Sequence, residues 1–159
     1  VRSPSGLQEP GAVELADGSL WGWCRTAAGR QWQFASRDCG ETWTAPQPSR
    51  FRSPNGPLSI KRIPATGDLL AVWNDLTRRP ATASQQRTPL AAAISRDEGR
   101  TWRHTRLLED DPDRGFCYTA IHFAGDEVLL AYCCGGRGGG ILQDLCIRRV
   151  PVEWFYGRG

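Results

Sequence analysis

The sequence has only one lysine, Lys61, and it lacks any cluster of basic residues. Lysine and arginine together number 20, so arginine supplies almost all of the positive charge. The arginines are spread along the chain without a run of five or more basic residues, and the net charge is only +3. Nucleic-acid-binding proteins usually concentrate basic residues in one run or on one face. We therefore predict no nucleic-acid partner and expect single arginines to bind carboxylates, which match the guanidinium fork.

The sequence also lacks a long apolar stretch and a metal-binding motif. No segment approaches the roughly 18 apolar residues that a membrane-spanning helix needs. The six cysteines show no C-x-x-C spacing and no pairing with His104 or His122 that would suggest zinc. We therefore predict no membrane span, no metal site and no cofactor.

Turn-forming residues are common. The chain contains 18 glycines and 11 prolines among 159 residues, with 40% hydrophobic and 23% charged residues. The last two fractions are ordinary for a globular protein, and the length suffices for one domain with a sizeable core. Because glycine and proline divide the sequence into short segments, we predict an all-β fold.

One eight-residue pattern occurs twice. It reads SRDCGETW at residues 36–43 and SRDEGRTW at residues 95–102, and the two copies start 59 residues apart (95 − 36). Three positions in each copy define the turn: Asp38, Gly40 and Trp43, then Asp97, Gly99 and Trp102. The aspartate can accept hydrogen bonds from backbone N–H groups of its own turn, and the glycine permits a positive φ. We expect each tryptophan to fold under its hairpin and bury a large apolar area, a structural role.

Short apolar runs bounded by turn residues surround both copies, as expected for β-strands. The predicted strands cover residues 11–15, 20–25, 30–36, 58–63, 69–74, 88–95, 118–123, 127–133 and 142–150. We group them into three units of three or four antiparallel strands within a single domain. The units cover approximately residues 1–50, 51–110 and 111–159, and the third has no copy of the eight-residue pattern.

This organisation predicts part of a β-propeller, in which the eight-residue pattern is the Asp-box turn. Propellers have about four to eight blades, and closure of the ring protects the sheet edges. Three units leave one side open, so we expect the remaining blades from an upstream stretch of the same natural chain. The start at Val1, without an initiator methionine or a signal peptide, favours a fragment or a processed product.

Four polar residues occupy the beginnings or ends of predicted strands, where blade loops converge on a propeller axis. Glu9 precedes Pro10 at a strand entrance, Arg25 ends a strand, Arg87 precedes a strand and Tyr118 begins one. Two further segments, residues 52–57 and 73–75, are candidates for the rim of a pocket at this end.

With this ordered set the chain resembles the bacterial exo-sialidase (neuraminidase) family, whose six-bladed propellers carry Asp-boxes, also called BNR repeats. The resemblance covers almost all 159 residues but only the later half of a family catalytic domain. The matching features are Glu9-Pro10, Asp17-Gly18, Arg25-Thr26, Arg87-Thr88 before the second Asp-box, and Tyr118 before Gly125-Asp126. The Asp-box alone also occurs in other propellers, so the interleaved Glu, Arg, Arg and Tyr make the resemblance specific.

The resemblance implies a role for each of these residues. Tyr118 resembles the nucleophile and Glu9 the carboxylate that removes its proton. Arg25 and Arg87 resemble the second and third members of the arginine triad that grips the substrate carboxylate. The first arginine and the acid/base aspartate come from earlier blades that this chain does not contain, so we expect the isolated chain to be inactive or very weak.

The implied function is hydrolysis of a glycoside, releasing terminal sialic acid from glycoconjugates with retention of configuration. A neutral phenol avoids the repulsion that a carboxylate nucleophile would meet from the carboxylate on the anomeric carbon. Since free tyrosine has a pKa of about 10, the phenol needs a base. One alternative is a non-catalytic Asp-box propeller that binds glycan or protein, with incidental arginines and Tyr118. Another is a hydrolase of the same scaffold acting on a different acidic sugar.

Overall fold

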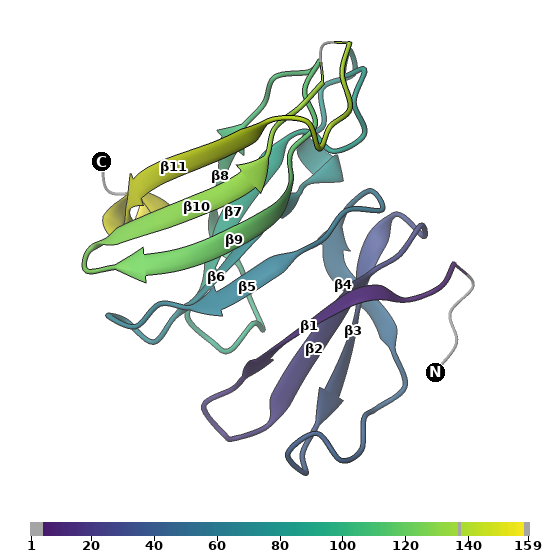
Figure 1. Cartoon of the computed structure of the whole chain (residues 1–159). Coiled ribbons are helices and arrows are strands. Elements are labelled where there is room, and N and C mark those ends of the chain that lie inside the picture. Colours follow the sequence, from purple (N-terminus) through teal and green to yellow (C-terminus); the bar gives the residue numbers. More distant parts are fainter. Residues whose placement is uncertain (1–4, 137, 158–159) are drawn as a thin grey trace.

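The computed structural model describes residues 5–136 and 138–157, which form three antiparallel sheets in succession along the chain (Figure 1). The first contains β1 (Gln8–Glu14), β2 (Leu20–Arg25), β3 (Arg30–Ser36) and β4 (Gln47–Arg52). The second contains β5 (Ser59–Arg62), β6 (Leu69–Asn74), β7 (Leu90–Ser95) and β8 (Arg103–Glu109). The third contains β9 (Cys117–Ala124), β10 (Glu127–Cys133) and β11 (Leu145–Pro151). Short 3₁₀ helices η1 (Leu76–Arg78) and η2 (Val152–Tyr156) follow β6 and β11.

The all-β prediction is confirmed, and each sheet follows chain order from one edge to the other. All nine predicted strands are present, some of them with shifted ends. The largest differences are at β1, which begins at Gln8 rather than at residue 11, β7, which begins at Leu90 rather than at residue 88, and β11, which begins at Leu145 rather than at residue 142. Two strands without a predicted counterpart, β4 and β8, follow the two Asp-boxes. They carry few apolar residues because they are the outer strands of their sheets. The first four and last two residues of the predicted units lie outside the described residues.

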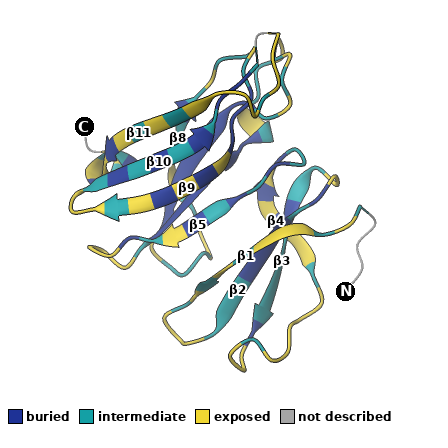
Figure 2. Cartoon of the chain, in the orientation of Figure 1, coloured by how far each residue is buried: buried dark blue, intermediate teal, exposed yellow. Residues whose placement is uncertain are grey.

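The middle sheet is covered on both faces, as its dark blue strands show (Figure 2). Every residue of β6 and β7 is buried, including the alanines of the LAAAI run. One apolar core lies between the first and second sheets and another between the second and third. A strand buried on both faces needs a continuous apolar run instead of alternation, which explains these two sequences.

The first strands of the three sheets lie side by side, in the order β1, β5, β9. The Ser59 hydroxyl on β5 donates to the carbonyl of Thr119 on β9 at 2.6 Å. The Lys61 ammonium donates to the Ile121 carbonyl at 3.0 Å. These bonds fix the third sheet against the second, and the contact of β1 with β5 places the first sheet on the other side.

Both Asp-boxes form the same network. In the second, Asp97 accepts hydrogen bonds from the Thr101 amide at 2.7 Å and from the Thr101 hydroxyl at 2.6 Å. The Ser95 hydroxyl donates to Asp97 and accepts from the Gly99 amide. Hydrogen bonds from the threonine hydroxyl and amide lower the pKa of Asp38 and of Asp97 to about 2. Gly40 and Gly99 have the predicted positive φ of 93° and 80°.

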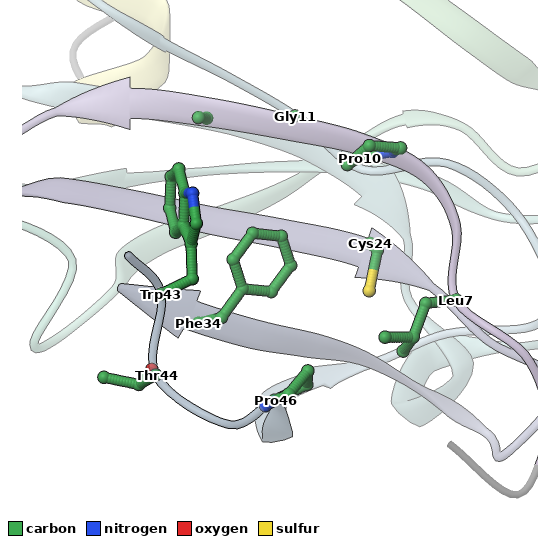
Figure 3. Close-up of a pocket in the computed structure, with 9 residues that line it drawn as sticks. Leu7, Pro10, Gly11, Cys24, Phe34, Trp43, Thr44 and Pro46 are labelled. Atoms are coloured by element: carbon green, nitrogen blue, oxygen red, sulfur yellow. The ribbon is translucent and has the colours of Figure 1, made fainter. Parts of the chain in front are cut away.

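The predicted burial of Trp43 is wrong. Trp102 packs edge-on against Phe51 at 5.2 Å and lies against Trp21 at 6.3 Å, both from the preceding sheet. Trp43 belongs to the first sheet, contacts Phe34 at 5.2 Å and remains 38% exposed. It lines an apolar hollow of about 540 Å³ on the outer face of that sheet (Figure 3). Trp102 is therefore partly buried against the first sheet, whereas Trp43 has no preceding sheet among the described residues.

Candidate functional site

The predicted nucleophile and base are in direct contact. The Tyr118 hydroxyl donates a hydrogen bond of 3.0 Å to Oε1 of Glu9. The same oxygen lies 3.0 Å from Nη2 of Arg25, forming an ion pair. One carboxylate oxygen on β1 therefore joins the end of β2 to the start of β9, across two sheets that are not adjacent.

Arg87 completes the group. Its guanidinium carbon lies 5.5 Å from the centroid of the Tyr118 ring, within range of a cation–π interaction. Burial by itself would lower the pKa of Arg87, but contacts with Cys117 and Tyr118 raise it above the usual arginine value. The guanidinium therefore remains charged at neutral pH. The structure thus brings together all four residues predicted from the sequence: Glu9, Arg25, Arg87 and Tyr118.

Glu9 and Tyr118 occupy matching β-bulges. The pairing of β1 with β2 shifts between Gln8 and Gly11, and the pairing of β9 with β10 shifts between Ala131 and Cys133. Glu9 has φ 50° and Tyr118 has φ 58°, a left-handed conformation that is uncommon outside glycine. Bulges re-aim side chains at the edges of sheets. Neither bulge was predicted from the strand pattern, which carries no signal for a single inserted residue.

The site is open on the side of the nucleophile and recessed on the side of the arginine. Tyr118 is 41% exposed and the Glu9 side chain is 39% exposed, whereas the Arg25 side chain is 13% exposed. With two guanidinium groups and one carboxylate, the group carries a net positive charge. An anion arriving from solvent therefore meets a phenol at the entrance and two cations behind it.

The two predicted rim segments have different positions. Nη2 of Arg87 donates to the Asn55 carbonyl at 3.0 Å, and Nη1 of Arg25 is 3.5 Å from the same oxygen. The amide of Asn74 donates to the Arg87 carbonyl at 2.9 Å. Trp73 is buried in the core between the first and second sheets and Asp75 caps η1, so neither lies at a rim.

Sequence reasoning assigned no function to Gln31, which lies in β3 and is fully buried. Its side-chain amide donates to the Ser53 hydroxyl at 2.8 Å and to the Gly56 carbonyl at 2.7 Å. The alternation of β3 directs the polar side chain of Gln31 inward, and this is the sequence signal that could have identified it.

No three His, Cys, Asp or Glu side chains within residues 5–136 and 138–157 are arranged to hold a metal ion. Over that part of the chain, no helix is long and apolar enough to cross a membrane. All six cysteines are free thiols, and Cys39 lies exposed in the first Asp-box.

Comparison with known proteins agrees with the Asp-boxes and the sheet order. Residues 3–130 match the BNR repeat-like domain, which defines the class of protein. The chain belongs to this family, and the resemblance to propellers with Asp-boxes, or BNR repeats, is confirmed. A search of curated proteins found no significant match.

Solved structures extend the comparison to the fold. An intramolecular trans-sialidase from Ruminococcus gnavus is 21% identical with a TM-score of 0.67, covering 91% of this chain and 32% of that one. A leech intramolecular trans-sialidase is 19% identical with a TM-score of 0.70, covering 92% and 24% respectively. An α-L-arabinofuranosidase from Fusarium graminearum is 21% identical with a TM-score of 0.57, covering 84% and 42%. The chain thus spans less than half of each, and its fold is a partial β-propeller.

Proposed function

We propose that this chain is the later part of a propeller glycosidase that releases terminal sialic acid from glycoconjugates with retention of configuration. The observation that carries the proposal is the contact of 3.0 Å between the Tyr118 hydroxyl and Glu9. The fold is shared with trans-sialidases and with an arabinofuranosidase, which supports a glycoside hydrolase of this scaffold.

Tyr118 is the nucleophile in this proposal, and Glu9 is its general base. The hydroxyl and the carboxylate are within the reach of about 2.6–3.2 Å that proton transfer requires. As the phenol oxygen attacks the anomeric carbon, its proton passes to Glu9 and the bond to the leaving group breaks. Water then cleaves the tyrosyl–sugar bond, which releases the sugar with its original configuration.

Arg25 and Arg87 bind the carboxylate of the sugar. Charge-assisted hydrogen bonds from guanidinium groups are stronger than neutral ones and can be two-pointed. In the free protein Arg25 already pairs with the Glu9 carboxylate at 3.0 Å. A bound sialic acid adds a second carboxylate to the site, which Arg87, whose charge faces the Tyr118 ring, binds together with Arg25.

The complete enzyme requires groups from preceding blades. These are a third arginine and the aspartate that protonates the leaving group, both of which the family resemblance assigns to earlier parts of the propeller. We propose that an upstream stretch of the natural chain supplies them, and that its last blade covers the apolar hollow beside Trp43 (Figure 3).

The second candidate is a glycosidase of the same scaffold with another sugar. The structural match to an α-L-arabinofuranosidase supports this candidate, since the sugar in that enzyme's name, arabinose, is neutral. The two arginines instead favour an acidic sugar.

The test compares release of a fluorogenic leaving group from an α-sialoside and from an α-L-arabinofuranoside by the complete protein. Turnover of the sialoside supports the proposal, and turnover of the arabinofuranoside alone rejects it in favour of the second candidate. Turnover of neither, with glycan binding retained, favours a non-catalytic propeller.

A further inference from the structure

Both site arginines converge on one backbone carbonyl. Nη2 of Arg87 and Nη1 of Arg25 lie 3.0 Å and 3.5 Å from the oxygen of Asn55. Two guanidinium groups repel each other, so the carbonyl dipole between them offsets part of that repulsion. The position of this oxygen also sets the distance between the two cations, since both are directed toward it.

The loop that carries this carbonyl, residues 53–57, connects the first sheet to the second and is held by Gln31. The Gln31 amide donates at 2.8 Å to the Ser53 hydroxyl on one side of Asn55 and at 2.7 Å to the Gly56 carbonyl on the other. Gln31 is fully buried. A buried NH2 group is costly unless it is hydrogen-bonded, so the two bonds from the Gln31 Nε2 atom favour a single loop conformation.

The loop is also confined on its other side. A Cβ atom at Gly56 would lie 2.9 Å from Oδ1 of Asn74, closer than real Cβ contacts. The amide of that asparagine donates to the carbonyls of Arg87 and Phe116, each at 2.9 Å. Movement of the loop toward the second sheet is therefore blocked by a side chain that is itself bonded to the segments carrying Arg87 and Tyr118.

We propose that Gln31 is a positioning residue for the arginine pair. Acting through the Asn55 carbonyl, it fixes the spacing of Arg25 and Arg87 and so determines how strongly the site prefers a ligand that bears a carboxylate. This inference rests on the proposed function, in which the two arginines bind the carboxylate of the sugar. It goes further by assigning selectivity to a residue of β3 that does not touch the ligand.

The test measures the affinity of the complete protein for methyl α-sialoside and for its carboxyl methyl ester by calorimetry. The ratio of the two affinities reports the carboxylate preference alone. In Gln31→Leu the loop loses both hydrogen bonds, and we expect the ratio to fall about tenfold, as when a hydrogen bond to a charged group is weakened. Ser53→Ala removes one of the two bonds, and we expect a smaller fall, about two- to threefold.

Ser36→Ala is the matched control, because it removes hydrogen bonds from the first Asp-box in the same sheet without touching the loop. It should lower the melting temperature and leave the ratio unchanged. A merely structural role for Gln31 would weaken binding of the acid and of the ester equally. An unchanged ratio in folded Gln31→Leu overturns the inference, and Ser53→Ala decides the matter if the first variant does not fold. A wild-type protein that does not distinguish acid from ester overturns the proposed arginine clamp itself.

Discussion

The Tyr118 hydroxyl is bonded to the Glu9 carboxylate at 3.0 Å, although 109 residues separate the two in the sequence. Each residue lies in a bulge of the first strand of its sheet, with φ 58° for Tyr118 and 50° for Glu9. A non-glycine residue in this conformation costs about 1–3 kcal/mol and persists only where the surroundings impose it. Two such residues in contact indicate that the surrounding sheets hold both of them in this conformation.

Replacing Tyr118 with phenylalanine removes the nucleophilic oxygen and retains the ring beneath Arg87. We expect turnover of a fluorogenic α-sialoside by the complete protein to fall to background, because no other phenol is in contact with Glu9 among the described residues. The matched control is Tyr156→Phe, which removes a hydroxyl bonded to Asp68 at 2.7 Å in another part of the molecule. Turnover of Tyr118→Phe near the wild-type rate would remove this residue from its role.

Arg87→Lys separates charge from shape. Lysine keeps the positive charge and loses the planar fork that binds a carboxylate at two points and faces the Tyr118 ring. We expect KM for the sialoside to rise about tenfold or more, as for loss of a charge-assisted hydrogen bond. Arg103→Lys, on the outer strand β8, should leave KM unchanged. Equal KM values for Arg87→Lys and wild type would contradict the clamp.

The lowered pKa values of Asp38 and Asp97 predict how stability depends on pH. Each carboxyl has a pKa of about 2 in the folded chain and about 3.9 when unfolded. A depressed pKa stabilises the fold above the unfolded value, and this contribution is lost as the pH falls toward 2. We expect the free energy of unfolding in urea to decrease between pH 4 and pH 2. The double variant Asp38→Asn/Asp97→Asn should be less stable at pH 7 and show a weaker decrease, whereas an unchanged slope would contradict the assignment.

Local features of the molecule could be predicted from the sequence, and contacts between sheets largely could not. The Asp-box turns follow from hydrogen bonds within a few residues, as in Ser95 and Asp97. The four site residues were identified by their order relative to the boxes, since strand ends meet at one side of a propeller. Gln31 was missed because its partners, the Ser53 hydroxyl and the Gly56 carbonyl, lie in a connecting loop whose path the strand pattern does not predict. The predicted burial of Trp43 was wrong because the exposure of this side chain depends on the neighbouring blade and not on its own hairpin.

Gly99 and Gly18 provide a test of contact between the first two sheets. Both have nearly the same positive φ, 80° and 79°, so alanine is strained equally at either position. A Cβ at Gly99 would lie 2.7 Å from the Trp21 ring of the preceding sheet, whereas one at Gly18 meets nothing within 4 Å. We expect Gly18→Ala to cost about 1 kcal/mol and Gly99→Ala about 1–3 kcal/mol more, the usual cost of overpacking. Equal losses in urea unfolding would mean that the two sheets do not pack as described.

The two Asp-box tryptophans test whether a further blade precedes the first sheet. In this chain Trp102 lies between two sheets and Trp43 is 38% exposed beside the hollow (Figure 3). Trp102 is partly buried between them, so Trp102→Ala should cost about 3 kcal/mol, the lower end of the range for a large aromatic residue in a core. Trp43→Ala should cost clearly less, because part of its surface already contacts water.

In the complete protein the two losses should become similar, because the proposed upstream blade would cover Trp43 as the first sheet covers Trp102. The two substitutions are matched in residue type and in position within the Asp-box, so the comparison isolates the neighbouring blade. If Trp43→Ala remained the milder change in the complete protein, the hollow would be open there too. The upstream stretch would then not pack against the first sheet, and the missing arginine and aspartate would have to reach the site by another route.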